Sequence, residues 1–291
     1  MRRSAQTLIL LRVSAAVASA GRASTGLQFI CEHLQGARQV VPDRSASSVN
    51  AARLRHLEAA YSHVPQNIRS SGSLNLEFGV REGLSINHLA NLTRSAGIMW
   101  DGFDSFQGLP GSSVASKHWR ARAFTTHGRM PHVFDNVRLH AGWFNNTLPP
   151  FLDSPLATGR HAAFLHLDAD IFESTWTVLD AVCARCLLRV GTVLAFDELA
   201  GKRSIGQRQL EHEWRALRLA AAKYKFDFRF ITWMMHKVSP YIRVAVQITR
   251  IGASPSCPAI AGPEGRMLAR ASTGMKPRMV GPVQVACKRR S

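Results

Sequence analysis

The chain has 291 residues, enough for one α/β domain with a sizeable core or for two small domains. It carries 37 Lys and Arg against 19 Asp and Glu, a formal net charge of +18, which would ordinarily suggest nucleic acid or an anionic membrane surface as a partner. However, residues 1–50 and 252–291 supply +4 and +6 of that charge, and the middle lacks a basic stripe with interleaved aromatics. This distribution argues against a nucleic-acid groove. The longest apolar runs stay below 18 residues, so we expect no transmembrane span.

The two ends differ in composition from the middle of the chain. Residues 1–36 are rich in Arg, Ser and Ala and hold no acid before Glu32, which is typical of a transit peptide and predicts a mitochondrial or plastid location. A signal-peptide core over Thr7–Ala20 and a cytoplasmic protein with a disordered N-terminus are the alternatives. Residues 252–291 hold five of the thirteen prolines and no periodic apolar pattern, so we expect a disordered basic tail. The folded domain is therefore predicted over residues 51–251.

Between the ends, seven short apolar, β-branched or aromatic runs predict β-strands. Helix-length segments separate the first five, which predicts parallel pairing in a Rossmann-like, doubly wound α/β sheet. Only about a dozen residues, including Ser239-Pro240, separate the last two, so these should pair antiparallel. The predicted strands are Leu74–Phe78, Ile98–Phe103, Val137–His140, Ala162–Leu167, Thr192–Phe196, Phe226–Trp233 and Arg243–Ile248.

A glycine-containing turn follows the first predicted strand. In such sheets ligands bind beyond the carboxyl ends of the strands, so residues at these ends are candidates for the site. Gly79 would let the backbone approach a ligand, and Gly83 would let the next helix begin close to the sheet. The pattern Glu-x-Gly-x-x-x-Gly, starting at Glu77, lacks the third glycine of dinucleotide sites and also fits an ordinary strand-to-helix junction.

The second and third strands are followed by candidate nucleoside-binding residues. Asp104 lies about 25 residues beyond the glycine turn, where an acid would hold the hydroxyls of a ribose, although an Asp that caps its own loop is an equal alternative. Phe106 could lie against an adenine or within the core. Gly142 and Trp143 begin an aromatic segment that could wall the adenine pocket, and packing is the alternative there too.

Carboxylates follow the fourth and fifth strands, in the segments HLDADIFEST and FDEL. They are Asp168, Asp170, Asp197 and Glu198, and they could converge as hard oxygen ligands for a magnesium-like ion. Helix caps and solvated loop acids are the alternative, and Glu173 is expected to cap a helix.

Three further polar residues stand out near these segments. We expect His140 and His166 to be structural. Glu213 lies in an amphipathic segment that could reach the acceptor side, although a solvated helix face is the simpler interpretation.

Together these motifs resemble class I S-adenosylmethionine-dependent methyltransferases, and most closely the macrocin O-methyltransferases. The resemblance runs from about Leu74 to Ile248. It lies in the segments 102–110, 142–149, 167–175 and 191–198, which read GFDSFQGLP, GWFNNTLP, LDADIFEST and GTVLAFDE.

The resemblance implies a seven-stranded sheet with an antiparallel last strand and S-adenosylmethionine as cofactor. It implies that Glu77, Gly79 and Gly83 surround the methionine part and Asp104 the ribose. The full predicted cofactor set is Glu77, Gly79, Gly83, Ser85, Asp104, Ser105, Phe106, Gly142 and Trp143.

The resemblance also implies O-methylation of a small hydroxylated acceptor that the acids after strands four and five would face. Of these acids, we expect Asp168 or Asp170 to be the base. In the macrocin group the acids after strands four and five resemble a magnesium site, here Asp168, Asp170, Asp197 and Glu198. That group tends to show two aspartates where this chain has Asp197-Glu198, so magnesium is an open expectation. The alternatives are a nicotinamide-dependent oxidoreductase and a non-catalytic binding protein with the same fold.

Overall fold

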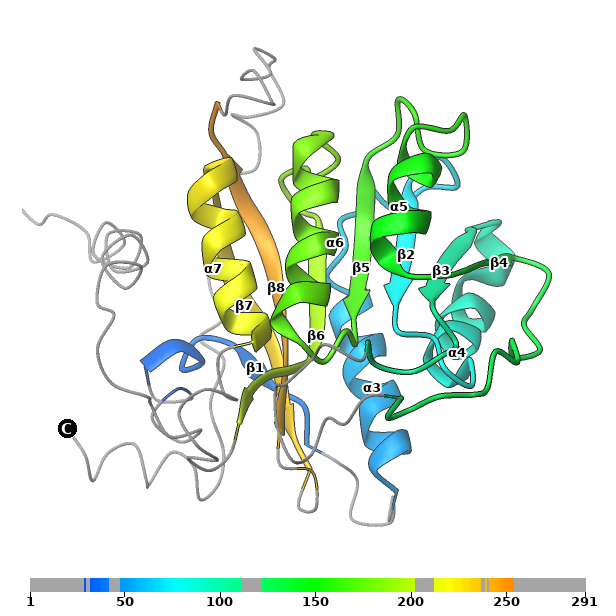
Figure 1. Cartoon of the computed structure of the whole chain (residues 1–291). Coiled ribbons are helices and arrows are strands. Elements are labelled where there is room, and N and C mark those ends of the chain that lie inside the picture. Colours follow the sequence, from blue (N-terminus) through cyan, green and yellow to red (C-terminus); the bar gives the residue numbers. More distant parts are fainter. Residues whose placement is uncertain are drawn as a thin grey trace, which may run out of the picture.

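The computed structural model describes residues 29, 32–41, 48–110, 122–201, 212–236, 239 and 241–253. They form three layers, with helices α5, α6 and α7 on one face of a central sheet and α3 and α4 on the other (Figure 1). The helices are α3 (Val49–Tyr61), α4 (Leu84–Thr93), α5 (Phe144–Leu152), α6 (Phe172–Ala184) and α7 (His212–Tyr224), with a short 3₁₀ turn η1 (Arg94–Ala96).

The sheet has the strand order β1-β7-β8-β6-β5-β2-β3-β4. Strand β8 pairs antiparallel with both β6 and β7, and every other neighbouring pair is parallel. The strands are β1 (Arg38–Gln39), β2 (Leu74–Phe78), β3 (Trp100–Asp104), β4 (Val137–Ala141), β5 (Ala162–Leu167), β6 (Val193–Gly201), β7 (Phe226–Met235) and β8 (Tyr241–Ile251).

All seven predicted strands are present, and the antiparallel placement of the last strand is confirmed. The sheet has an eighth strand, β1, which pairs with β7 and is only two residues long, too short to produce a periodic pattern. Phe29 and Leu34 are buried in the same core, and Ser48 caps α3. The ordered domain thus extends N-terminal to residue 51. Most of residues 1–36 and 252–291 lies outside the described residues. Their interpretation as a targeting segment and as a disordered basic tail stays a prediction.

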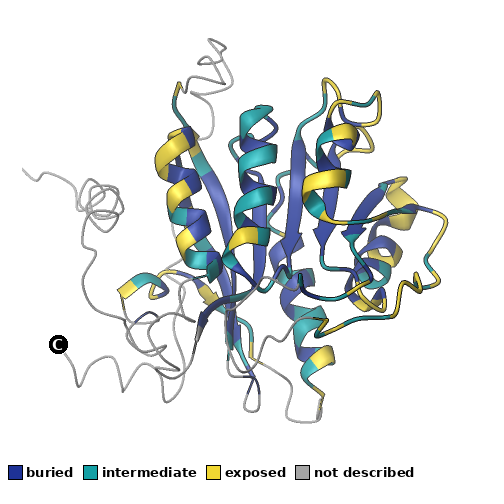
Figure 2. Ribbon diagram, in the orientation of Figure 1, coloured by how far each residue is buried: buried dark blue, intermediate teal, exposed yellow. Residues whose placement is uncertain are grey.

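The central strands are apolar because both of their faces are covered by helices (Figure 2). In β5, alternate side chains enter different cores: Leu165 and Leu167 lie in the cluster under α5, α6 and α7, and Phe164 lies in the cluster under α3 and α4. The continuous apolar run that predicted this strand therefore reflects burial on two sides.

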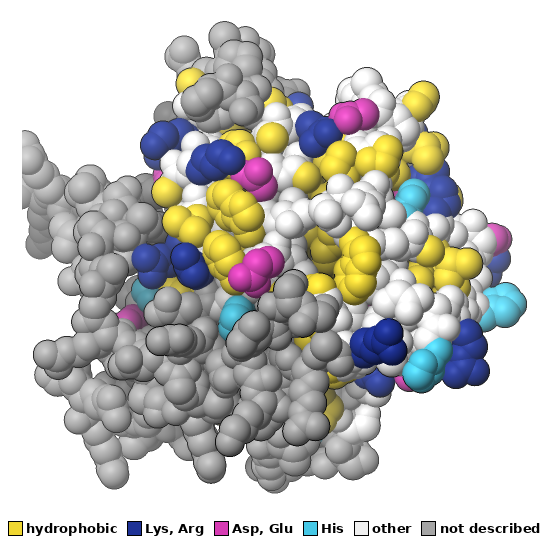
Figure 3. Space-filling view, in the orientation of Figure 1, with side chains coloured by type: hydrophobic (Ala, Val, Ile, Leu, Met, Phe, Trp, Pro, Cys, Tyr) yellow, Lys and Arg dark blue, Asp and Glu magenta, His cyan; other side chains and the backbone are white. Residues whose placement is uncertain are grey.

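The outer helices show the opposite pattern, with one buried and one solvated face. On α6 and α7, basic side chains lie next to hydrophobic ones (Figure 3). The Arg215 guanidinium is 4.4 Å from the ring centre of Phe172, and the Lys223 ammonium is 5.3 Å from that of Trp176. Part of the basic charge thus covers aromatic rings. No described helix has the length and apolar character needed to cross a membrane.

Gly79 brings the ends of β2 and β5 together. Its φ is +97°, a region that L side chains rarely adopt, and a Cβ added there would overlap the backbone carbonyl oxygen of Asp168. The Asp168 amide donates to Phe78 O at 2.9 Å, so the two strand ends are in direct backbone contact. A glycine at this position is required for chain packing.

We predict that Gly79→Ala lowers the free energy of unfolding by at least about 3 kcal/mol, because left-handed backbone strain and backbone overlap both contribute. Gly159→Ala is the matched control, since Gly159 has φ of +75° and open space around its missing Cβ. It should lose only the backbone term, about 1 to 2 kcal/mol. Urea denaturation measures both, and equal losses would contradict the predicted overlap.

Candidate active site

A cavity of about 530 Å³ opens at the carboxyl edge of β2, β3, β5 and β6. Its volume lies in the range of small-molecule sites. Nine of the predicted site residues line it: Gly79, Ser85, Asp104, Ser105, Trp143, Asp168, Asp170, Asp197 and Glu198. Most of the residues predicted at the strand ends therefore line one cavity. Glu77, Gly83, Phe106 and Gly142 do not line it.

Asp104 holds the loops on one side of the cavity. One carboxylate oxygen accepts the backbone N–H of Arg81 at 2.7 Å, and the other accepts that of Phe106 at 2.7 Å. This is the loop-capping geometry, and it ties the glycine turn after β2 to the loop after β3. Each oxygen keeps acceptor capacity, so a ribose remains compatible with Asp104.

The other nucleoside-binding candidates divide between wall and core. Trp143 is 38% exposed and lines the cavity. Phe106 is 2% exposed and packs in the core beside α3 and α4, so its side chain does not face a ligand. Gly142 donates to Asp104 O at 2.9 Å, and a Cβ there would lie 2.8 Å from Thr147, which makes it a packing glycine. Gly83 begins α4 with φ of +76°.

A buried chain of hydrogen bonds starts at Ser85 in α4. Ser85 donates to one oxygen of Glu77 at 2.9 Å, and His166 Nδ1 lies 3.0 Å from the other. His166 Nε2 lies 3.2 Å from an oxygen of Asp197. Because both ring nitrogens face carboxylates, His166 is a doubly protonated imidazolium. The histidine expected to be structural thus links Ser85, at one side of the cavity, to Asp197.

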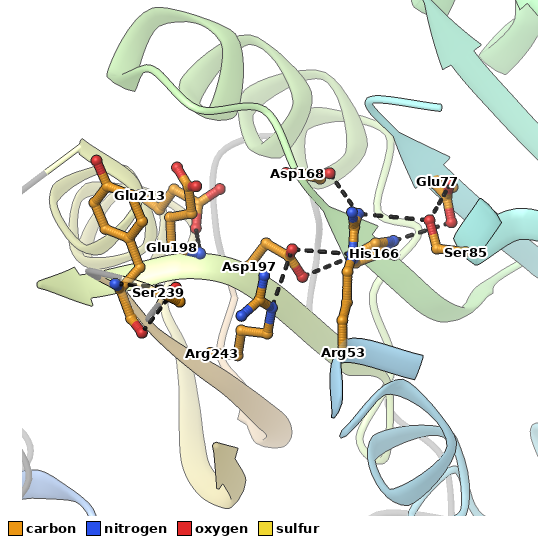
Figure 4. Close-up of polar contacts among 11 residues, drawn as sticks. Arg53, Glu77, Ser85, His166, Asp168, Asp197, Glu198, Glu213, Ser239 and Arg243 are labelled. Atoms are coloured by element: carbon orange, nitrogen blue, oxygen red, sulfur yellow. Dashed lines mark hydrogen bonds and ion pairs between the residues drawn. The ribbon is translucent and has the colours of Figure 1, made fainter. Parts of the chain in front are cut away.

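Asp197 ends this chain and faces two arginines as well (Figure 4). Its second carboxylate oxygen is 3.0 Å from Arg53 Nε and 3.2 Å from Arg243 Nε. Burial favours the neutral acid, but Arg53, Arg243 and His166 outweigh it and hold the pKa of Asp197 well below its usual range. Asp197 is therefore a permanent carboxylate.

The same network charges His166. Burial alone would lower its pKa, but Glu77 and Asp197 outweigh burial and raise the pKa of His166 to about 9. His140, the other histidine singled out in the sequence, lies elsewhere: it bonds Asp101 at 2.9 Å and stacks on Phe103. The expectation of a structural role fits His140.

Asp168 and Asp170 have different partners although they are two residues apart. Asp168 forms an ion pair with Arg53 Nη2. Asp170 has a left-handed backbone, with φ of +61°, and is hydrogen-bonded to Glu198. Burial and the charge of Asp168 raise the pKa of Asp170 well above its usual value.

Glu198 and Glu213 lie beyond Asp197, on the side away from His166 (Figure 4). Glu213 is 1% exposed and accepts the backbone N–H of Glu198 at 3.0 Å. The interpretation of Glu213 as part of a solvated face was therefore wrong. The buried positions of α7, Glu213, Ala216, Leu217 and Ala220, follow helical spacing and could have revealed it. Burial, together with neighbouring carboxylates, raises the pKa of both glutamates well above its usual range.

The four predicted metal ligands do not converge on one point. Asp168 and Asp197 face Arg53, whereas Asp170 and Glu198 bond each other. Among the residues that the structure describes, no group of three or more His, Cys, Asp or Glu side chains is arranged to hold a metal ion. The side-chain arrangement does not fit a magnesium site.

Two smaller expectations also change. Asp197 and Glu198 lie inside β6, at a register irregularity between Phe196 and Ala200, and not after the strand. Glu173 lies in the first turn of α6 without making a capping hydrogen bond, and Ile171 is the N-cap residue. An acid in the first turn still interacts favourably with the helix dipole.

Arg53 and Arg243 were missed from the sequence. Arg53 precedes the buried residues His56, Leu57 and Ala60 of α3 by three, four and seven positions, which places it on the buried stripe. Arg243 lies within the buried stretch 242–248 of β8. Both are signals of a buried partner, because a buried arginine needs a counter-charge.

Comparison with known proteins addresses the function of this fold and cavity. Residues 76–199 match a family model described as a methyltransferase domain. The matched segment contains the glycine turn, Asp104 and the four acids predicted as metal ligands. A comparison with curated protein sequences finds no match.

Solved structures with a similar fold include several methyltransferases. CalS11, a TDP-rhamnose 3'-O-methyltransferase of calicheamicin biosynthesis, is 20% identical, covers 85% of this chain and 96% of its own, and has a TM-score of 0.44. The O-methyltransferase NovP is 21% identical, with coverages of 68% and 80% and a TM-score of 0.46. The Podospora anserina methyltransferase PaMTH1 is 15% identical, with coverages of 86% and 98% and a TM-score of 0.41.

A doubly wound sheet with an antiparallel last strand and a ligand-sized cavity at its carboxyl edge defines the class I methyltransferase fold. The match of residues 76–199 identifies this part of the chain as a methyltransferase domain. The prediction made from the sequence motifs is confirmed at that level.

The buried imidazolium predicts a pH-dependent stability. The pKa of His166 is about 9 in the folded protein and 6.5 in the unfolded chain, so between these values only the folded protein binds the proton. The contribution is complete below pH 6.5 and is lost as the pH rises through 9, a fall in the free energy of unfolding of about 3 kcal/mol. Urea denaturation at pH 6, 7.5 and 9 measures it.

The control is His166→Gln, which keeps a hydrogen-bonding side chain and removes the titration. This variant should be less stable at pH 6 and should lose most of the pH dependence between 6.5 and 9. An unchanged slope in the variant would show that His166 is not the group responsible.

Proposed function

We propose that this methyltransferase acts on a hydroxyl oxygen of a small acceptor and that Asp170 accepts the hydroxyl proton. The observation that carries the proposal is that one cavity is lined on one side by the glycine turn and Asp104 and on the other by Asp168, Asp170 and Glu198. A cofactor and an acceptor bound on these two sides would face each other across a short distance.

The residues of the cofactor side fit S-adenosylmethionine. Gly79 lines the cavity, and Asp104 has acceptor capacity for the ribose hydroxyls. Glu77 is fully buried, so it would act through Ser85, which it fixes at 2.9 Å and which does line the cavity. When bound, the cofactor supplies a methyl sulfonium, a strong electrophile.

Asp170 is a better base than Asp168. Asp168 is held in an ion pair with Arg53, whereas burial and the charge of Asp168 raise the pKa of Asp170 well above its usual value. General bases work best when their pKa lies near the working pH. Asp170 would take the acceptor proton as the hydroxyl oxygen bonds the methyl carbon, while the carbon–sulfur bond breaks and its electron pair stays on sulfur. Glu198, hydrogen-bonded to Asp170, would hold its orientation.

No step of this scheme passes through magnesium. The charges that a metal would supply are already present as Arg53 and Arg243, each in contact with Asp197. The role of the protein is then to align the acceptor and to remove its proton.

Cofactor binding tests the first half of the proposal. Titration calorimetry with S-adenosylhomocysteine should show binding, and Asp104→Ala should weaken it at least tenfold because the ribose partner and the loop anchor are both lost. The control Asp135→Ala, at an exposed acid that pairs with Arg94, should bind as the native protein does. Heat with NAD and none with S-adenosylhomocysteine would favour the oxidoreductase alternative.

The base is tested with Asp170→Asn. We predict that it lowers kcat by about 10² to 10⁴ and leaves the S-adenosylhomocysteine Kd within about twofold. The native kcat should fall as the pH drops through the raised pKa of Asp170, because the base must be ionised. The assay is S-adenosylhomocysteine release with a panel of small sugars and phenols.

The control Asp153→Asn changes an exposed acid that pairs with Arg185 and should leave kcat unchanged. Cofactor binding without transfer to any acceptor, in the native protein and in Asp170→Asn alike, would favour the binding-protein alternative.

A further inference from the structure

Arg53 bridges the two acids that were expected to bind a metal. Its Nη2 forms an ion pair with Asp168, which follows β5, and its Nε lies 3.0 Å from Asp197 in the neighbouring strand β6. One guanidinium thus joins carboxylates from two adjacent strands (Figure 4). The planar, forked shape of arginine suits such bridging.

Arg53 is held in this position by its surroundings. It projects from α3, whose buried residues pack against the sheet, and its side chain is only 16% exposed. Its Nη2 also lies 3.5 Å from Ser85 Oγ, next to the glycine turn. The guanidinium therefore lies at the junction of the cofactor side and the acid side of the cavity.

A divalent ion and Arg53 would compete for the same oxygens. Magnesium binds oxygen at about 2.0 to 2.1 Å and demands near-octahedral geometry, which a guanidinium on the same carboxylates prevents. Charge leads to the same conclusion: Asp168 and Asp197 already face three cationic groups, Arg53, Arg243 and His166. An additional dication would leave excess charge in a buried site.

We propose that Arg53 is a built-in cation that takes the place of a divalent metal between Asp168 and Asp197, so that methyl transfer in this protein requires no metal. Arg53 is then a positioning residue that fixes both acids relative to Ser85. The inference rests on the proposed function of the same cavity, but metal binding can be measured without any methyl transfer.

The experiment titrates Mn²⁺ into the full-length protein and follows the free-ion signal by electron paramagnetic resonance. The native protein should leave the signal unchanged at up to tenfold excess, and dialysis against EDTA should leave its S-adenosylhomocysteine affinity and transfer rate unchanged. Bound Mn²⁺ that is lost in Asp168→Asn, or transfer abolished by EDTA and restored by Mg²⁺, would overturn the proposal.

A second variant tests the competition directly. Arg53→Met keeps much of the side-chain length and removes the charge, so it should gain one Mn²⁺ site that Arg53→Met/Asp197→Asn lacks. Thermal unfolding with and without Mn²⁺ gives an independent readout, since a bound ion raises the Tm. A folded Arg53→Met that binds no Mn²⁺ would contradict the proposal, and if the variant does not fold, the native titration decides.

The cofactor measurement separates the two proposals. If S-adenosylhomocysteine fails to bind the native protein, the proposed function fails whatever the metal result. If it binds and the native protein also binds Mn²⁺ through Asp168, only the inference about Arg53 fails.

Discussion

The site depends on one buried carboxylate, that of Asp197, which three cationic groups surround. His166 contacts one oxygen, and Arg53 and Arg243 contact the other. A buried ion is tolerated only when it is paired and hydrogen-bonded, so these contacts are a condition for placing an acid inside β6 at all. Because each cation comes from a different element, α3, β5 and β8, the pairing of Asp197 also fixes these elements relative to β6.

This arrangement connects the two halves of the cavity. His166 extends the hydrogen-bonded chain from Asp197 to Glu77. Glu77 accepts a hydrogen bond from Ser85, on the side of the cavity where we propose that the cofactor binds. Arg53 continues to Asp168 on the acid side. Asp170 and Glu198 remain outside the network, and burial together with the charge of Asp168 gives Asp170 the raised pKa that suits a base. The four neighbouring acids therefore differ in their proposed roles because arginines pair with Asp168 and Asp197, whereas Asp170 and Glu198 lie outside these ion pairs.

The sequence predicted the sheet well because its central strands are buried on both faces and read as continuous apolar runs. It also located Asp168, Asp170, Asp197 and Glu198 at the cavity, since the first two follow β5 and the other two lie in the carboxyl half of β6. It could not separate the roles of these acids, because that depends on side-chain direction, such as the left-handed backbone of Asp170. The partners escaped prediction for a related reason: Arg53 lies on a helix with little amphipathic contrast, where an arginine is ordinarily solvated. Phe106 was misjudged because a core aromatic and a ligand-stacking aromatic have the same sequence pattern.

The most direct test is a crystal structure of the full-length protein grown with S-adenosylhomocysteine and Mn²⁺. The account predicts that the nucleoside lies beside Asp104, that Arg53 remains between Asp168 and Asp197, and that no anomalous manganese peak lies between these two acids. A manganese peak there, with Arg53 displaced from Asp197, would contradict the claim that the protein's own cations organise this site.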